Sequence, residues 1–383
     1  MLRLTRLVLT DFRTYASLTW RPGARISVLA GPNGSGKTNL LEAISLLVPG
    51  RGLRGARGGE LPRIGGAGGW AVAGRFRTVL GDADIGTGIA PGGGDRRVFR
   101  LDGAAPRTQA EIAARVAAVW LTPRMDRLFQ EGLSGRRRFL DRLVWALEPA
   151  HARDVAAHDA AMAQRNRLLT GGGADPAWLS GLEDTMARHA VSATAARRAL
   201  VARLNLLPPT GAFPAARIGL TCAIGARLAD NPALEVEDWL RRSLAIGRAR
   251  DAAAGGAGLG AHRADMTLAG RDTGIEAAQA STGQQKALLI GIVLSHAALI
   301  DETRGFAPLL LLDEPAVHLD AGRRAALFDA LRESPAQIVL TGTDLDTFRP
   351  LEGTAEALLA GDGALVPSSG FRDPCPLSRE AGA

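Results

Sequence analysis

One stretch decides the fold of this 383-residue chain: residues 25–48 read RISVLAGPNGSGKTNLLEAISLLV. The apolar run 25–30 predicts a short strand, and the apolar face of residues 37–48 predicts a helix. The loop between them matches GxxxxGK[ST], in which glycines let backbone N–H groups surround phosphates at a helix start. We expect Lys37 to reach the β- and γ-phosphates and Thr38 to offer its hydroxyl to Mg²⁺. The predicted nucleotide-binding residues of the loop are Gly31, Pro32, Asn33, Gly34, Ser35, Gly36, Lys37 and Thr38.

Two carboxylates follow a second apolar run far downstream. Residues 309–312 are four leucines, which predict a buried strand, and Asp313 and Glu314 come directly after them. Open α/β sheets bind ligands at the carboxyl ends of their strands. Asp313 is therefore the predicted Mg²⁺ ligand. Glu314 is a predicted catalytic residue, together with Lys37, and would orient or deprotonate the attacking water.

A third motif, S-x-G-Q at residues 281–284, precedes the apolar segment 287–300. A serine and a glycine at the start of a helix form a cap and an anion-binding nest. Alone, this pattern is typical of an ordinary helix cap. Its order in the chain matters more: it follows the phosphate-binding loop and precedes both Asp313-Glu314 and Leu319-Asp320.

This set of motifs resembles an ATP-binding cassette of the SMC kind, in which S-x-G-Q is the signature motif. From Lys37 to Ser281 the chain runs 244 residues, about twice the gap that transporter cassettes have. A mostly helical insertion of this length is similar to that of the RecF family. Strings resembling that family's pattern are LTDFRTY (9–15), KTNLLEAI (37–44), GRRRFLD (135–141), QRNRLL (164–169), GAHRAD (260–265) and TGTD (341–344).

The resemblance implies an α/β fold: a P-loop ABC-type ATPase head, SMC-like, with an inserted and mainly helical second lobe. We expect an N-terminal part of the ATPase lobe over 1–120, the helical lobe over 121–257 and a C-terminal part of the ATPase lobe over 258–383. Within the chain, short strands at 70–76 and 98–101 predict a β-meander, and periodic Ala, Leu and Arg over 108–206 predict helices.

The resemblance also implies an activity. In this family the signature of one subunit caps the γ-phosphate held by the P-loop of another, so Ser281, Gly283, Gln284 and Asp320 join the nucleotide-binding residues. The implied cofactors are ATP and Mg²⁺. An ATP-dependent homodimer would clamp duplex or gapped DNA and release it on slow hydrolysis, with RecO and RecR as partners in RecA loading.

The chain departs from the family pattern at several positions. Ala261 and Ala264 stand where proline and aspartate are usual, and Lys286 replaces an arginine after the signature. Thr343 lies where transporter cassettes have a switch histidine. Without that imidazole we expect slow hydrolysis, suited to a timing switch.

Charge and composition point to polyanionic partners. The net charge is +7, and 44 of the 46 basic residues are arginine, whose guanidinium forks suit phosphate oxygens. An arginine-rich surface can equally be solvated or paired with carboxylates of the same chain. Aromatic residues make up only 4%, which disfavours single-strand binding by base stacking. The candidate DNA-binding residues are Arg51, Arg54, Arg57, Arg136, Arg137 and Arg138.

Other features narrow the class of protein. The N-terminus is not a secretory signal and the apolar segment 287–300 contains Ser295 and His296, so we expect a cytoplasmic protein without a membrane partner. Cys222 and Cys375 give no disulfide framework or cysteine zinc site, and the six histidines show no metal-ligand spacing. Any metal is therefore expected to arrive with a substrate.

Three alternatives remain open. An ATP-binding subunit of an ABC transporter would explain the cassette, although the long insertion and Thr343 argue against it. A P-loop phosphotransferase would leave residues 281–285 and Asp320 without a role. A nucleotide-binding scaffold without catalysis is disfavoured by Glu314.

Overall fold

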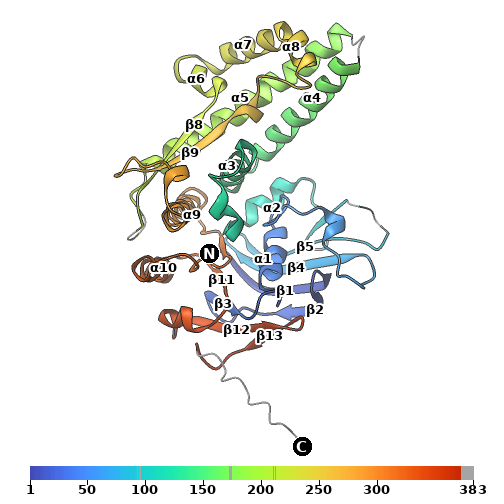
Figure 1. Ribbon diagram of the computed structural model, residues 1–383. Coiled ribbons are helices and arrows are strands. Elements are labelled where there is room, and N and C mark those ends of the chain that lie inside the picture. Colours follow the sequence, from blue (N-terminus) through green and yellow to red (C-terminus); the bar gives the residue numbers. More distant parts are fainter. Residues whose placement is uncertain (93, 95, 172–174, 210, 212, 372–383) are drawn as a thin grey trace, which may run out of the picture. The chain divides into compact units, whose positions relative to one another are not determined.

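The computed structural model describes residues 1–92, 94, 96–171, 175–209, 211 and 213–371 (Figure 1). The chain forms two compact units: the first contains residues 1–125, 211–213 and 297–383, and the second contains 126–210 and 214–296. The expected lobe boundaries at 120/121 and 257/258 differ from these, mainly at the second boundary. Residues 258–296 belong to the second unit because β9 (Asp265–Gly270) pairs antiparallel with β8 (Ala216–Thr221). Cys375 lies outside the described residues.

A six-stranded sheet forms the core of the first unit. Its strand order is β13-β12-β3-β11-β10-β7, and all neighbours are parallel except the β12–β13 pair. The predicted strands at 25–30 and 309–312 are confirmed as β3 and β10. Both are buried along their whole length, as expected where both faces of a parallel sheet are covered. The strands are β3 (Ile26–Ala30), β7 (Ala118–Leu121), β10 (Leu309–Leu312), β11 (Ile338–Gly342), β12 (Ala355–Gly361) and β13 (Ala364–Pro367).

The same unit has a five-stranded antiparallel sheet of order β2-β1-β4-β5-β6. Along β4 buried and exposed residues alternate strictly, so one face of the sheet is apolar and the other is open to solvent. The predicted β-meander is confirmed, but β2 and the glycine-rich β5 were missed. These strands are β1 (Arg3–Phe12), β2 (Tyr15–Trp20), β4 (Trp70–Thr78), β5 (Gly81–Ile89) and β6 (Val98–Leu101).

Helix α1 (Lys37–Leu46) contacts strands of both sheets, namely β1 and β4 of one and β10 and β11 of the other. It is therefore held between the two sheets (Figure 1). The remaining helical elements of this part of the chain are α2 (Gln109–Arg115), α10 (Ala321–Glu333) and the short 3₁₀ turns η1 (Gly58–Glu60), η2 (Pro123–Arg127) and η5 (Asp346–Leu351).

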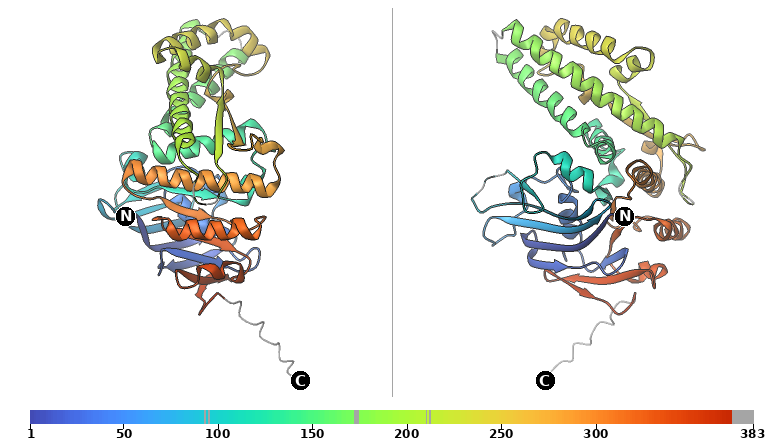
Figure 2. Two further views of the ribbon diagram at one scale, coloured as in Figure 1. Left: turned by 90° about the vertical axis from the view of Figure 1, so that its left-hand side faces the viewer. Right: turned by 180° about the vertical axis from the view of Figure 1, so that it is seen from behind.

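The second unit is mainly helical, as expected for the insertion. Helices α4 and α5 pack side by side as a long hairpin (Figure 2), and Asp175 caps α5 by accepting the N–H of Ala177 at 2.8 Å. Its elements are α3 (Leu133–Leu147), α4 (His151–Gly171), α5 (Pro176–Leu206), α6 (Ala223–Asp230), α7 (Ala233–Ile246), α8 (Arg248–Ala253), η3 (Ala261–Arg263) and η4 (Ala277–Gln279).

A buried ion network holds this helical unit together. The guanidinium of Arg165, on α4, is fully buried and contacts Glu183 of α5 and Asp251 of α8, both at 2.9 Å. Arg248 binds the same Glu183 at 2.6 Å. Because removing one member would leave a buried charge unpaired, the network fixes how these helices pack.

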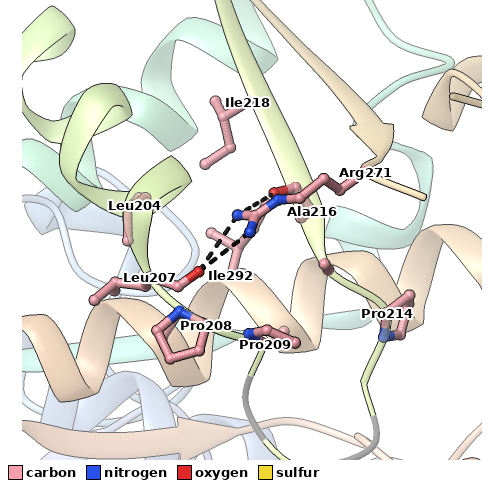
Figure 3. A pocket seen from close by; sticks show the side chains of 12 residues that line it. Leu204, Leu207, Pro208, Pro209, Pro214, Ala216, Ile218, Arg271 and Ile292 are labelled. Atoms are coloured by element: carbon pink, nitrogen blue, oxygen red, sulfur yellow. Dashed lines mark hydrogen bonds between the residues drawn. The ribbon is translucent and has the colours of Figure 1, made fainter.

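The C-terminal end of α5 is closed by Arg271 (Figure 3). Its guanidinium donates to the carbonyl oxygens of Asn205 at 2.8 Å and of Leu207 at 3.4 Å, which satisfies carbonyls that the helix leaves free. The cavity beside it measures only about 20 Å³. That volume holds about one water molecule, so we assign no ligand to it.

Helix α9 (Thr282–Arg304) begins in the second unit and ends in the first. Of the helices in the described ranges, it alone is long and apolar enough to cross a membrane, and 78% of that apolar window is buried within the protein. This burial is typical of a core helix, as predicted for residues 287–300.

Candidate nucleotide-binding site

The loop between β3 and α1 has the backbone of a phosphate-binding loop. Gly31, Gly34 and Gly36 adopt φ angles of 150°, 85° and 101°, which are strained for residues with a side chain. A Cβ on Gly36 would lie 2.8 Å from the hydroxyl oxygens of Thr14 and Tyr15. Tyr15 donates its hydroxyl to the Gly36 carbonyl at 3.0 Å, and burial raises the pKa of Tyr15 to about 12. Thr14 and Tyr15, at the turn between β1 and β2 and at the start of β2, thus lie against the loop at Gly36.

The first turn of α1 is open to an anion. Gly36 provides no side-chain cap, so the N–H groups at the start of the helix are available to phosphate oxygens. Lys37 folds back over the loop and donates to the carbonyls of Gly31 at 2.6 Å and Pro32 at 2.8 Å. Burial lowers the pKa of Lys37, while the charges of Glu314 and Asp313 oppose that shift. Lys37 is thus within electrostatic reach of both predicted acidic residues.

Thr38 and Asp313 lie together although 275 positions separate them. The Thr38 hydroxyl donates to Asp313 Oδ1 at 2.9 Å, because α1 begins beside the carboxyl end of β10. One hydroxyl and one carboxylate are the hard oxygen ligands that Mg²⁺ prefers. No cluster of three or more metal-ligating side chains occurs in the described residues. The remaining ligands would therefore be water and phosphate, which fits a metal that enters with its nucleotide.

Thr341 connects the two acidic residues, a role that our sequence interpretation missed. Its buried hydroxyl donates to Asp313 Oδ1 at 2.7 Å and accepts the N–H of Glu314 at 2.9 Å. The strand register explains the contact: β11 runs parallel to β10 with Leu340 opposite Leu312, so the next residues of the two strands are neighbours. The sequence does not show this register.

The loop after β10 stores backbone strain. Glu314 has a φ of 49° and His318 a φ of 64°, a left-handed conformation uncommon for residues other than glycine. Such strain persists where the surrounding structure requires it, often at functional sites. Glu314 adopts this left-handed conformation directly after Asp313, while its backbone N–H donates to the Thr341 hydroxyl.

Thr343 is exposed just after β11, and no imidazole stands at this position. Its hydroxyl donates to Asp344 Oδ2 at 3.1 Å. Burial acts to raise the pKa of Asp344, but hydrogen bonds from Thr347 and Thr343 lower it below the ordinary value. The position after β11 thus carries a hydroxyl held by a carboxylate, and its role in place of a switch histidine stays a prediction.

The signature residues form a capping box at the start of α9. Ser281 Oγ accepts the N–H of Gln284 at 3.3 Å, and Gln284 Oε1 accepts the N–H of Ser281 at 2.9 Å. Both residues are exposed, and Gly283 between them is half-buried. They belong to the second unit, whereas the P-loop, Asp313 and Glu314 belong to the first.

Asp320 also caps a helix. It lies in the first unit, and its Oδ1 accepts the N–H of Arg323 at 2.8 Å at the start of α10. The ordinary capping role therefore accounts for Asp320 as well as for Ser281 in the free chain, and their nucleotide-binding role stays a prediction.

Two of the candidate DNA-binding arginines are paired with carboxylates of the chain. Arg54 donates to Asn39 at 2.7 Å and to the buried Glu42 at 3.1 Å. Arg136 forms a two-pronged pair with Asp265 at 2.7 and 3.0 Å. The alternative of intramolecular pairing thus accounts for both, because these guanidinium groups are already engaged.

The other candidates differ in exposure. Burial lowers the pKa of Arg137, which is half-buried, whereas Arg51, Arg57 and Arg138 are exposed. A continuous basic cluster over 136–138 is therefore not what the structure has.

Comparisons with known proteins concern both the P-loop region and the whole chain. Residues 26–102, which contain the P-loop, match the family model "AAA domain, putative AbiEii toxin, Type IV TA system". The chain is 48% identical to the DNA replication and repair protein RecF of Mesorhizobium japonicum, over 95% of this chain and 98% of that protein.

Solved structures show the same fold. The recombination mediator protein RecF-ATPrS in the RecFOR pathway aligns with a TM-score of 0.82 and 22% identity, over 96% of this chain and 98% of that one. The SMC head domain from Pyrococcus furiosus, with an extended coiled coil, aligns with a TM-score of 0.50 and 14% identity, over 96% of both chains. The fold is thus an SMC-like ATPase head with a helical insertion. By its near-complete alignment at 48% identity, the chain belongs to the RecF family of DNA replication and repair proteins.

Proposed function

We propose that this chain is an ATP-dependent DNA-binding protein of recombinational repair and replication, whose ATP-driven homodimer clamps duplex or gapped DNA. The observation that carries the proposal is the continuous contact from Thr38 through Asp313 and Thr341 to Glu314. It brings the P-loop, the proposed metal ligand and the proposed catalytic residue to one sheet edge. A binding scaffold without catalysis would not need the strained Glu314.

ATP and Mg²⁺ are the proposed cofactors. The N–H groups of α1 and the Lys37 ammonium would hold the phosphates, and Thr38 and Asp313 would hold the metal. A bound Mg²⁺ would neutralise phosphate charge. On nucleotide binding Lys37 would exchange the carbonyls of Gly31 and Pro32 for phosphate oxygens. Glu314 would then orient the attacking water, and Thr343 in place of a histidine favours slow turnover.

The exposed signature supports a dimer with two nucleotides between its subunits. Ser281 and Gln284 satisfy each other in the free chain, so a partner's γ-phosphate would have to replace weak neutral hydrogen bonds with charge-assisted ones. Ser281, Gly283, Gln284 and Asp320 would complete the site of the partner subunit. Clamping would follow ATP binding and release would follow hydrolysis.

RecO and RecR are the proposed protein partners, and the proposed task is to help RecA load at gaps. Family membership supports this, as does the likeness to a protein of the RecFOR pathway. The proposed location is the cytoplasm. An ABC transporter subunit is the second candidate, and Thr343 together with the long helical unit argues against it.

Sedimentation velocity tests the dimer. Wild-type protein is expected to dimerise with ATP and Mg²⁺ but not with ADP, and Glu314→Gln is expected to accumulate dimer. Ser281→Arg is expected to remain monomeric while it still binds ATP. Ser281→Thr keeps a capping hydroxyl and serves as the control. A wild-type protein that stays monomeric in ATP would contradict the proposal.

A further inference from the structure

The solvent-facing side of the five-stranded sheet carries an unusual set of charges. We call it the basic sheet face; its charged residues are Arg3 and Arg6 on β1, Arg75 and Arg77 on β4, Asp82 and Asp84 on β5, and Arg100 on β6. Arg3 is half-buried, and the other six side chains are exposed. Five arginines and two aspartates leave this face with a formal charge of +3.

The register places like charges directly opposite each other. Arg3 pairs with Arg77 across β1 and β4, and Arg6 pairs with Arg75. Such cross-strand pairs are destabilising, and each strand could avoid them with a neutral residue. Strand pairing therefore does not explain why four arginines form two cross-strand pairs.

Carboxylates of the chain neutralise only part of this charge. Arg75 is held by Asp84 through two contacts of 2.8 Å. Asp82 lies opposite Arg77 in the register of β4 and β5, with no ion pair between the two. Within the described part of the chain, no carboxylate lies within ion-pair distance of Arg3, Arg6, Arg77 or Arg100, although the hydrogen bond from Arg75 and, to a lesser degree, the charge of Arg6 lower the pKa of Asp84. Their guanidinium groups are available to an external anion.

The same face carries small residues beside the arginines. Gly86 lies opposite Arg100 on β6 and opposite Ala73 on β4. A Cβ on Gly86 would meet only ordinary contacts, at 3.8 Å from Arg100 Cβ, so internal packing does not require glycine there. Glycine weakens a strand and often marks a place where another molecule approaches the backbone closely.

Aromatic side chains of these strands all point the other way. Phe12, Tyr15, Trp20, Trp70, Phe76 and Phe99 are buried. On this face the described strands therefore offer arginine forks and small residues but no ring on which a base could stack. This combination fits a regular phosphate backbone better than unpaired bases.

We propose that the basic sheet face binds the phosphate backbone of duplex DNA through Arg3, Arg6, Arg77 and Arg100. Arg100 aligns through Gly86 with Ala73, four residues along β4 from Arg77. With about 3.3 Å per residue along a strand and about 4.8 Å between strands, the four side chains span roughly 13 by 15 Å. About 13 Å of duplex axis carries about eight phosphate charges. This surface differs from the clusters at 51–57 and 136–138 that the sequence suggested, and the inference rests on the proposed DNA-binding function.

Salt dependence of duplex binding tests the proposal. The log of the association constant falls with log salt by about 0.9 for each phosphate contact. Arg77→Gln/Arg100→Gln is expected to reduce that slope by about 1.8 and to weaken binding equally for unrelated duplex sequences. Asp82→Asn removes a negative charge from the same face and is expected to tighten duplex binding. All three positions are exposed, so folding is expected to be unaffected.

A charge-matched variant excludes a general charge effect. Arg167→Gln/Arg242→Gln removes two exposed arginines of α4 and α7 and is expected to keep the wild-type slope. If Arg77→Gln/Arg100→Gln also keeps it, or if both variants lower it equally, the basic sheet face is not the DNA surface. The proposed function survives that result, because wild-type binding remains.

Two further results also decide the matter. Wild-type protein that binds no duplex overturns the proposed function and this inference together. If Arg77→Gln/Arg100→Gln retains duplex binding but loses binding to phosphatidylserine vesicles, the face is a membrane surface and the proposal is wrong.

Discussion

Replacing Thr341 with valine removes one hydroxyl and leaves the shape of the side chain nearly unchanged. Thr341 is fully buried and its hydroxyl makes two hydrogen bonds, one to the Asp313 carboxylate and one from the Glu314 N–H. A hydrogen bond to a charged group contributes about 1.5–3 kcal/mol and a neutral one about 1 kcal/mol. The free energy of unfolding of the first unit is therefore expected to fall by about 3 kcal/mol.

The same change is expected to act on Mg²⁺. Asp313 keeps its bond from Thr38 but loses the donor that fixes the other side of Oδ1, and loss of such an outer partner typically weakens metal affinity or activity about 10- to 100-fold. Urea titration measures the stability. Titration of ATP hydrolysis with Mg²⁺ measures the metal effect.

Thr341→Ser is the matched control because it keeps the hydroxyl. It is expected to retain Mg²⁺ affinity within about threefold and to lose only the stability of one buried methyl group, about 1 kcal/mol. Wild-type Mg²⁺ dependence in Thr341→Val would refute the reasoning, whatever happens to its stability.

Other changes have equally definite outcomes. Lys37→Ala is expected to abolish nucleotide binding, measured by calorimetry, and a retained ATP response would remove Lys37 from the site. Glu314→Gln is expected to bind ATP normally but to release phosphate at less than about 1% of the wild-type rate, since general-base catalysis contributes about 10²–10⁴-fold. Arg136→Gln would strand Asp265 and is expected to destabilise the second unit by about 2 kcal/mol in urea, whereas the exposed neighbour variant Arg138→Gln is expected to have no effect. Burial lowers the pKa of His262 from 6.5 to about 4, so on acidification the unfolded chain takes up a proton before the folded chain does. The contribution of His262 to the free energy of unfolding is therefore expected to be full above pH 6.5 and to decline toward pH 4. In urea titrations, His262→Gln is expected to show a weaker dependence of stability on pH over this range.

The sequence allowed much of the ATPase site to be predicted because its motifs are local. Residues 26–38 contain the strand, the loop and the helix start within one short string, and the buried leucines 309–312 end directly at Asp313. A parallel sheet with both faces covered makes such strands uniformly apolar, which is a clear signal.

Other parts depended on contacts that no local pattern encodes. Strand β5 reads GDADIGTGI, whose glycines and aspartates disfavour a strand, and it forms because β4 and β6 pair on either side. Residues 258–296 joined the helical unit because β9 pairs with a strand over forty positions upstream. The number of arginines can be read from the sequence, but their partners cannot. Only the fold shows that Arg136 pairs with Asp265 and that the strand register places Arg3 beside Arg77.

One measurement tests the central claim of a nucleotide-gated DNA clamp most directly. Fluorescence anisotropy of a labelled gapped duplex is titrated with protein at one fixed salt concentration, in ATP and in ADP, with Ser281→Arg alongside. The account predicts tighter binding in ATP than in ADP for the wild type and no such difference for Ser281→Arg. Equal binding in ATP and ADP by the wild-type protein would contradict it, since the arginines would then attract DNA without any control by the nucleotide.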